Sequence, residues 1–118
     1  MPHATEIEAG IVDELRALIS PEGVREIIDI YLSDAPKRLE DFQSGLKDGD
    51  LALARRAAHS LKSTAAYLGA RSFSTFCAEL ETAARVSDMG ALADGLPLLE
   101  RRLAQVLAEL GQVRSAVP

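Results

Sequence analysis

Residues 51–70 read LALARRAAHSLKSTAAYLGA, and the spacing of their apolar side chains decides the fold. Apolar positions recur every three or four residues, which is the repeat of one face of an α-helix. The segment therefore predicts an amphipathic helix that ends at Gly69. Its buried stripe is expected to consist of Leu51, Ala54, Ala58, Leu61, Ala65 and Leu68.

The segment before this helix, residues 20–49, predicts a longer helix. Ser20 followed by Pro21 is a typical helix start. Pro36 interrupts the pattern, which predicts a kink or a break into two helices. Gly49 is expected to end the helix, and Asp50 to cap the next one. The apolar stripe consists of Val24, Ile27, Ile28, Tyr31, Leu32, Ala35, Leu39, Phe42 and Leu46.

A short helix is expected in front, in residues 4–20. Thr5 is a candidate N-cap, because Glu8 follows three positions later as in a capping box. Helical spacing supports this interpretation. The apolar positions are Ile7, Ile11, Leu15 and Leu18.

Two more amphipathic segments follow Gly69, separated by residues 88–90 (DMG). The first directs Phe73, Phe76, Cys77, Leu80 and Ala84 inward, and the second Leu96, Leu99, Leu103, Val106 and Leu110. No strand pattern or repeat occurs. We therefore expect an all-α fold, an antiparallel four-helix bundle with a short extra N-terminal helix. Residues 1–118 would form one domain, with residues 1–4 and 112–118 as flexible tails.

Composition limits the possible functions. The chain has 118 residues, a formal net charge of −5 and one cysteine. An acidic chain is a poor partner for nucleic acid or an anionic membrane. The N-terminus lacks the pattern of a signal peptide, and no apolar run is long enough to cross a bilayer. We expect a cytoplasmic location.

His59 lies on the opposite side of the predicted helix from its apolar stripe. At about 100° per residue, the stripe is centred roughly 130° from this histidine, so the imidazole should be exposed. The segment from Leu51 to Ala78 contains four cations and no acid, which predicts a neighbourhood free of carboxylates. The residues that share the histidine's face are Ala52, Arg55, Arg56, Lys62, Ser63 and Ala66.

These surroundings suit phosphoryl transfer. A neutral imidazole is a nucleophile near pH 7, and nearby cations disfavour its protonated form. Cations also stabilise the oxygens of a transferring phosphoryl group, and small neighbours admit a second protein. The alternative is that His59 is an ordinary solvated surface residue without a function. A metal site is not expected, because His59 has no clustered ligands, and Cys77 fits the core.

The stretches AAHSLKSTAAYLGA and FCAELETAAR resemble the histidine-containing phosphotransfer (HPt) domain family. The matching positions are Ala58, His59, Leu61, Lys62, Leu68, Gly69, Ala70, Cys77, Leu80 and Glu81. The resemblance implies that His59 accepts the phosphoryl group and that Lys62 neutralises its oxygens. Arg55, Arg56, Ser63 and Ala66 would meet the partner. Ser63 departs from the family's usual glycine, which puts the speed of transfer in question.

The resemblance further implies a carrier in a two-component phosphorelay, not a kinase. Its partners would be the receiver domain of a response regulator or of a hybrid histidine kinase, which supplies the aspartate and Mg²⁺. The chain would need no cofactor of its own and act as a monomer. Two alternatives stay open. One is a helical scaffold without phosphotransfer, and the other is the dimerisation and phosphoacceptor domain of a histidine kinase.

Overall fold

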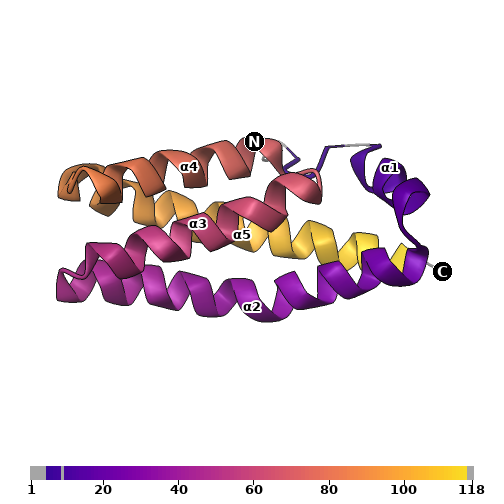
Figure 1. The fold of residues 1–118 in the computed structure, drawn as a ribbon, viewed down its shortest axis with the longest axis horizontal. Coiled ribbons are helices and arrows are strands. Elements are labelled where there is room, and N and C mark those ends of the chain that lie inside the picture. The colour runs from indigo at the N-terminus through magenta and orange to yellow at the C-terminus, as the bar shows by residue number, and fades with distance from the viewer. Residues whose placement is uncertain (1–4, 9, 117–118) are drawn as a thin grey trace.

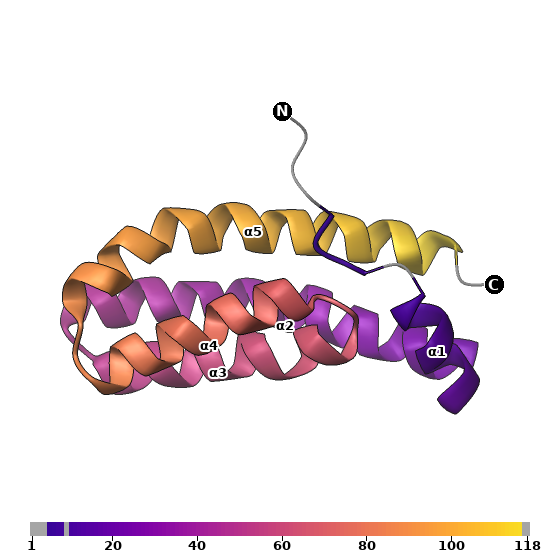
Figure 2. The ribbon, with the colours of Figure 1, turned by 90° about the horizontal axis from the view of Figure 1, so that it is seen from above.

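The computed structural model describes residues 5–8 and 10–116, which form five α-helices and no strand. The helices are α1 (Ile11–Leu18), α2 (Pro21–Asp48), α3 (Leu51–Tyr67), α4 (Arg71–Arg85) and α5 (Met89–Ala116). Helices α2 to α5 run along the long axis of the molecule, and α1 lies at one end (Figures 1 and 2). Both α3 and α5 pack against α2 and α4. The predicted bundle with a short N-terminal helix is confirmed.

The apolar stripes meet along the middle of the bundle. Of the stripe predicted for α3, Leu51 is half-buried and all the others are buried. The largest fully buried side chains come from α2 to α5 and the α3–α4 turn. They are Phe42, Phe73, Ile28, Leu61, Leu68, Leu92, Leu99, Leu103, Leu110, Val24, Val106 and Cys77. Within the part of the chain that the structure describes, no helix is both long enough and apolar enough to span a membrane.

Both ends of α2 follow the sequence prediction. The hydroxyl of Ser20 accepts a hydrogen bond from the N–H of Gly23 at 3.0 Å. Gly49 ends the helix in the left-handed region, with φ at 73°. Asp50 then caps α3, because its carboxylate accepts a hydrogen bond from the N–H of Leu53 at 3.1 Å.

Helix α2 continues through Pro36 as one helix, so of the two predicted alternatives, a kink or a break into two helices, the break does not occur. Proline removes one hydrogen bond within a helix. Pro36 lies on the exposed side of α2, where water can satisfy the freed carbonyl. The buried residues before and after it, Tyr31 and Phe42, hold both halves of the helix against the core.

Helix α1 begins later than the sequence predicts, because residues 5–8 bind elsewhere. We call these residues the N-terminal strap. The N–H groups of Glu6 and Ile7 donate to the carboxylate of Glu109 on α5 at 3.0 and 2.9 Å. The strap therefore uses its backbone donors on a distant helix instead of in a helix of its own.

The predicted capping box at Thr5 and Glu8 does not form. The N–H of Glu8 donates to the carbonyl of Gly69 at 2.9 Å. Gly10, with φ at 86°, precedes α1 in the left-handed region and separates it from the strap.

Helix α5 is longer than predicted at both ends. It begins at Met89, inside the stretch expected as a break, and continues past Gly111 to Ala116. Residues 112–116 are therefore helical and not a tail. One glycine inside a helix costs only about 1 kcal/mol, and the ion pair between Arg114 and Asp29 of α2 holds this last part in place. Residues 1–4 and 117–118, also expected as tails, lie outside the described residues.

Two contacts fix α3 against α2. The hydroxyl of Tyr31 donates to the carbonyl of Leu61 at 2.9 Å inside the bundle. Near the α2–α3 turn, Gly45 lets the helices approach so closely that a Cβ there would lie 2.7 Å from the carbonyl oxygen of Asp50 and 2.9 Å from the amide nitrogen of Ala54. These contacts set the position of the helix that carries His59.

Candidate functional site

His59 projects from the middle of α3 into solvent, as its position opposite the apolar stripe predicts. Its side chain is 61% exposed. The residues on the same face that were expected to be open, Ser63 and Ala66, are also exposed. The imidazole is therefore accessible to another protein.

Glu81, on the neighbouring helix α4, holds both His59 and Lys62. One of its carboxylate oxygens, Oε2, lies 2.9 Å from Nδ1 of His59. The other, Oε1, accepts a hydrogen bond from Nζ of Lys62 at 2.6 Å. The Glu81 side chain is only 10% exposed, so the carboxylate forms the floor of the site.

The prediction of a carboxylate-free neighbourhood is wrong. It considered only residues 51–78, which contain no acid, whereas the carboxylate comes from the next turn of α4. A signal for it exists in the sequence. Glu81 follows Cys77 and Leu80 and precedes Ala84, so it occupies the apolar stripe of its helix. The stripe of α4 was otherwise predicted correctly, although Phe76 is only half-buried.

Glu81 is held in its ionised form. The hydrogen bond from Lys62 lowers the pKa of Glu81, the hydrogen bond with His59 acts in the same direction, and desolvation opposes both. An ionised carboxylate only accepts hydrogen bonds, so the partner atom Nδ1 of His59 must carry the proton. In the neutral imidazole, Nε2 then keeps a free electron pair.

Nε2 is the ring nitrogen available for chemistry. Among residues 5–8 and 10–116 it has no hydrogen-bond partner. The tautomer of the ring is fixed, its nucleophilic nitrogen is open to solvent, and a carboxylate lies behind it. This arrangement is that of a nucleophile oriented by a neighbouring group.

Lys62 is less free than its sequence position suggests. Its side chain is 29% exposed, and its ammonium group is bound to Glu81. Its carbonyl accepts a hydrogen bond from the hydroxyl of Ser74 on α4 at 3.0 Å. This contact joins α3 to α4 beside the site and holds Lys62 close to Glu81.

A cavity of about 350 Å³ borders the imidazole. We call it the His59 cavity. Both Arg55 and Arg56 are exposed, as predicted, and neither guanidinium group has an ion pair or hydrogen bond with another described residue. The lining residues are Arg55, Arg56, His59, Ser60 and Glu81.

Ser63 lies one turn beyond His59, and its hydroxyl donates to the carbonyl of His59 at 2.9 Å. The hydroxyl is therefore directed back to its own helix, and the side chain adds little bulk beside the imidazole. Ala66, a further turn away, leaves that part of the face open.

Other groups in the described part of the chain offer no competing chemistry. It contains no cluster of three or more histidine, cysteine, aspartate or glutamate side chains that could hold a metal. Cys77 is buried, as expected, and burial raises the pKa of its thiol to about 12. A thiol in this state is a poor nucleophile at neutral pH.

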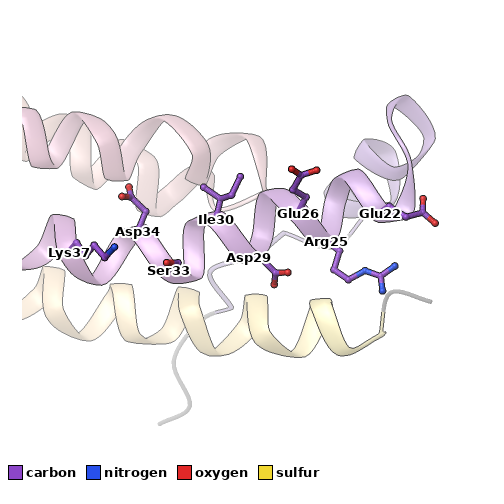
Figure 3. Close-up of a pocket in the computed structure, with 8 residues that line it drawn as sticks. All are labelled: Glu22, Arg25, Glu26, Asp29, Ile30, Ser33, Asp34 and Lys37. Atoms are coloured by element: carbon purple, nitrogen blue, oxygen red, sulfur yellow. The ribbon is translucent and has the colours of Figure 1, made fainter.

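A shallow groove lies along α2, away from Glu81 and His59. Figure 3 shows that all its lining side chains project from α2 alone. Four of them are acidic and two are basic, they surround the exposed Ile30, and no histidine or cysteine is among them. They are Glu22, Arg25, Glu26, Asp29, Ile30, Ser33, Asp34 and Lys37.

Comparisons with known proteins agree with this geometry. The family model of the Hpt domain matches residues 26–116. The crystal structure of histidine-containing phosphotransfer protein B (HptB) from Pseudomonas aeruginosa PAO1 is similar in fold, with a TM-score of 0.87 and 24% sequence identity over 98% of this chain and 100% of that chain. A comparison with curated proteins finds no match.

Proposed function

Because the chain belongs to the Hpt-domain family, whose role is histidine phosphotransfer in phosphorelays, we propose that His59 is the residue that carries the phosphoryl group. The hydrogen bond from Nδ1 of His59 to Glu81 carries this proposal. It fixes the proton on Nδ1 and leaves Nε2, on an exposed ring, as the nucleophile.

The proposed partner is a receiver domain that holds the phosphoryl group on an aspartate. The electron pair of Nε2 attacks phosphorus, the bond between phosphorus and the aspartyl oxygen breaks, and the aspartate leaves as a carboxylate. The proton stays on Nδ1, so the ring becomes cationic, and the negative charge of Glu81 stabilises it.

The same contact serves the reverse step. When the phosphoryl group moves to a second receiver, the bond between Nε2 and phosphorus breaks and its electron pair returns to the ring. Because Nδ1 keeps its proton, the ring leaves as a neutral imidazole, which is a better leaving group than an anion. Transfer in both directions therefore uses one arrangement of His59 and Glu81.

The cations around His59 have different proposed tasks. Lys62 offsets the charge of Glu81, and its flexible stem can bring the ammonium group toward a phosphoryl oxygen. Arg55 and Arg56 meet the partner or the phosphoryl group from the His59 cavity. Ser63 and Ala66 keep the surface low where the receiver approaches. Mg²⁺ would be supplied by the receiver.

A transfer assay tests the proposal. The full chain is incubated with a phosphorylated receiver domain, and the labelled residue is identified. We expect an acid-labile, base-stable adduct on His59. His59→Gln should abolish labelling and keep the helical circular-dichroism signal, whereas His3→Gln should label normally. Labelling that survives His59→Gln would contradict the assignment.

The same assay tests the scaffold alternative, since a scaffold would accept no phosphoryl group. The family match favours a phosphotransfer domain over the dimerisation domain of a histidine kinase. We propose that the chain is a monomeric cytoplasmic carrier. Elution as a dimer in gel filtration would contradict the monomer.

A further inference from the structure

The charges around the His59 cavity do not balance. Lys62 and Glu81 neutralise each other across a distance of 2.6 Å. The guanidinium groups of Arg55 and Arg56 have no acidic partner among the residues described. The cavity therefore has an excess of two positive charges in a chain whose formal net charge is −5.

Several other arginines in the structure do have acidic partners. Arg102 binds Glu6 through two hydrogen bonds of 2.7 and 2.9 Å, and Arg114 pairs with Asp29. Arg38 lies close to two aspartates. Arg85 and Arg101 also lack an acidic partner among the described residues, but they do not line the His59 cavity. Arg55 and Arg56 are thus two unpaired arginines that lie together beside the exposed histidine.

Two free guanidinium groups suit a phosphate. The planar group donates paired hydrogen bonds that match the oxygens of phosphate. Ser60, which also lines the cavity, adds a hydroxyl. The volume of about 350 Å³ is at the small end of the range for ligand sites, so a single phosphate group with a small substituent fits.

We propose that the His59 cavity binds a small phosphate-bearing molecule next to Nε2, and that His59 can take the phosphoryl group from a low-molecular-weight phosphoramidate without a protein donor. This inference rests on the proposed function, because it uses His59 as the acceptor. It adds a class of donor and assigns the binding of the phosphoryl oxygens to Arg55 and Arg56.

The step balances without a further reactant. Phosphoramidate at neutral pH carries an ammonium group bound to a phosphoryl dianion. The electron pair of Nε2 forms a bond to phosphorus, the bond between phosphorus and nitrogen breaks, and ammonia leaves with its electron pair. The Nδ1 proton remains on His59 and faces Glu81 at the distance of 2.9 Å seen in the free protein.

The test uses the full chain, phosphoramidate and no receiver, with intact-mass spectrometry at neutral pH as the readout. We expect a single phosphoryl adduct, absent in His59→Gln. The double variant Arg55→Gln/Arg56→Gln should be labelled about ten- to a hundredfold more slowly. Arg101→Gln on α5, an exposed arginine outside the cavity, is the matched control and should be labelled at the wild-type rate.

Inorganic phosphate supplies a second readout. It should slow wild-type labelling in competition with the donor, and it should shift the amide signals of residues 55–60 in an NMR titration. The double variant should show neither effect. Circular dichroism of each variant confirms that the helices are intact.

Labelling by a phosphorylated receiver runs in parallel and separates the two proposals. Labelling by the receiver but not by phosphoramidate would overturn this inference and leave the proposed function standing. If neither the receiver nor phosphoramidate labels the chain, both this inference and the proposed function are overturned. Equal rates of phosphoramidate labelling in the wild type and the double variant would show that the two arginines do not form the site.

Discussion

The carboxylate of Glu81 lies 2.9 Å from Nδ1 of His59, across the interface between α4 and α3. This one contact sets the tautomer of the ring and the nitrogen that remains nucleophilic, and under the proposed function it also sets the place where positive charge would be stabilised after phosphorylation. Its effects can be separated by substitution at either end.

Replacing Glu81 should slow transfer. Glu81→Ala removes the acceptor that fixes the proton on Nδ1, so we expect phosphotransfer from a receiver to fall about ten- to a hundredfold. Glu81→Gln keeps an acceptor without the charge and should lose less. Rapid-quench kinetics measure the rates, and ¹⁵N NMR of the imidazole reports the tautomer. Glu81→Ala with both rate and tautomer unchanged would contradict the positioning role.

Lys62 should act partly through Glu81. Lys62→Ala leaves the Glu81 carboxylate without its cationic partner beside the incoming phosphoryl group, so transfer should slow about ten- to a hundredfold, and Lys62→Arg should recover part of the rate. The stability loss should be about 1–2 kcal/mol, because a partly buried charged hydrogen bond is removed.

A double-mutant cycle tests how Lys62 acts. In a Glu81→Ala background no carboxylate remains to repel phosphate, so adding Lys62→Ala should slow transfer by a smaller factor than in the wild type. Equal factors in the two backgrounds would show that the ammonium group acts on the phosphoryl group independently of Glu81.

The stability contributed by Glu81 should depend on pH. Its pKa in the folded protein lies below the ordinary value of 4.5, mainly because of Lys62. The contribution is therefore present above pH 4.5 and is lost as pH falls through the lowered pKa. Wild type should exceed Glu81→Gln in unfolding free energy at pH 7, and this gap should narrow in acid.

Urea denaturation from pH 7 to pH 3 measures the difference in unfolding free energy between the wild type and Glu81→Gln. Glu40→Gln is a suitable control, because Glu40 is exposed on α2 and has no ion pair among the residues that the structure describes. The difference in unfolding free energy between the wild type and Glu40→Gln should stay small over the whole pH range. A gap for Glu81→Gln that does not change with pH would contradict the linkage.

Much of this fold follows from periodicity alone. The stripes of α2 to α5 were predictable because each helix buries one face, and Ser20, Gly49 and Asp50 act through local hydrogen bonds that their own sequence positions dictate. The N-terminal strap was not predictable, because its partner Glu109 lies far along the chain. Helical spacing also could not show that α2 stays one helix at Pro36, because the buried residues before and after the proline hold it against the core.

The candidate site also has features that the sequence predicts and features that it does not. The exposure of His59 follows from its phase on one helix. Its contact with Glu81 depends on how α4 is rotated and shifted against α3, which a pattern within one helix does not specify. The pairing of Lys62 was missed for the same reason, since its partner is again Glu81.

Ser63 gives a test of access to the imidazole. Ser63→Gly should keep or raise the transfer rate, because it removes the last side chain one turn beyond His59, and it should lower stability by a few tenths to about 1 kcal/mol. Ser63→Ala removes only the hydroxyl that donates to the His59 carbonyl. It should transfer like the wild type, and thermal melts provide the stability comparison. A clear fall in rate in Ser63→Gly would contradict the access argument.

Gly45 and Gly111 should respond oppositely to the same change. Alanine normally stabilises a helix by up to about 1 kcal/mol relative to glycine. At Gly45 the added methyl would meet backbone atoms at 2.7 and 2.9 Å, so Gly45→Ala should cost about 1–3 kcal/mol.

Gly111 has open space around it. Gly111→Ala should therefore raise stability by about 0.5–1 kcal/mol. Chemical denaturation of the two variants measures both effects. A Gly45→Ala protein as stable as wild type would show that α2 and α3 can move apart at this point.

The N-terminal strap also bears on the order in which the molecule folds. Its hydrogen bonds to Glu109 join residues 102 and 103 positions apart, and a chain loop of that length closes at a large entropic cost. The site, by contrast, lies within residues 55–81, on two helices that follow each other directly. The surface around His59 can therefore form together with the α3–α4 hairpin before the strap has bound to α5. In the folded molecule we expect the amide protons of Glu6 and Ile7 to exchange before those in the middle of α3, because their hydrogen bonds to Glu109 can open without disturbing the helix that carries His59.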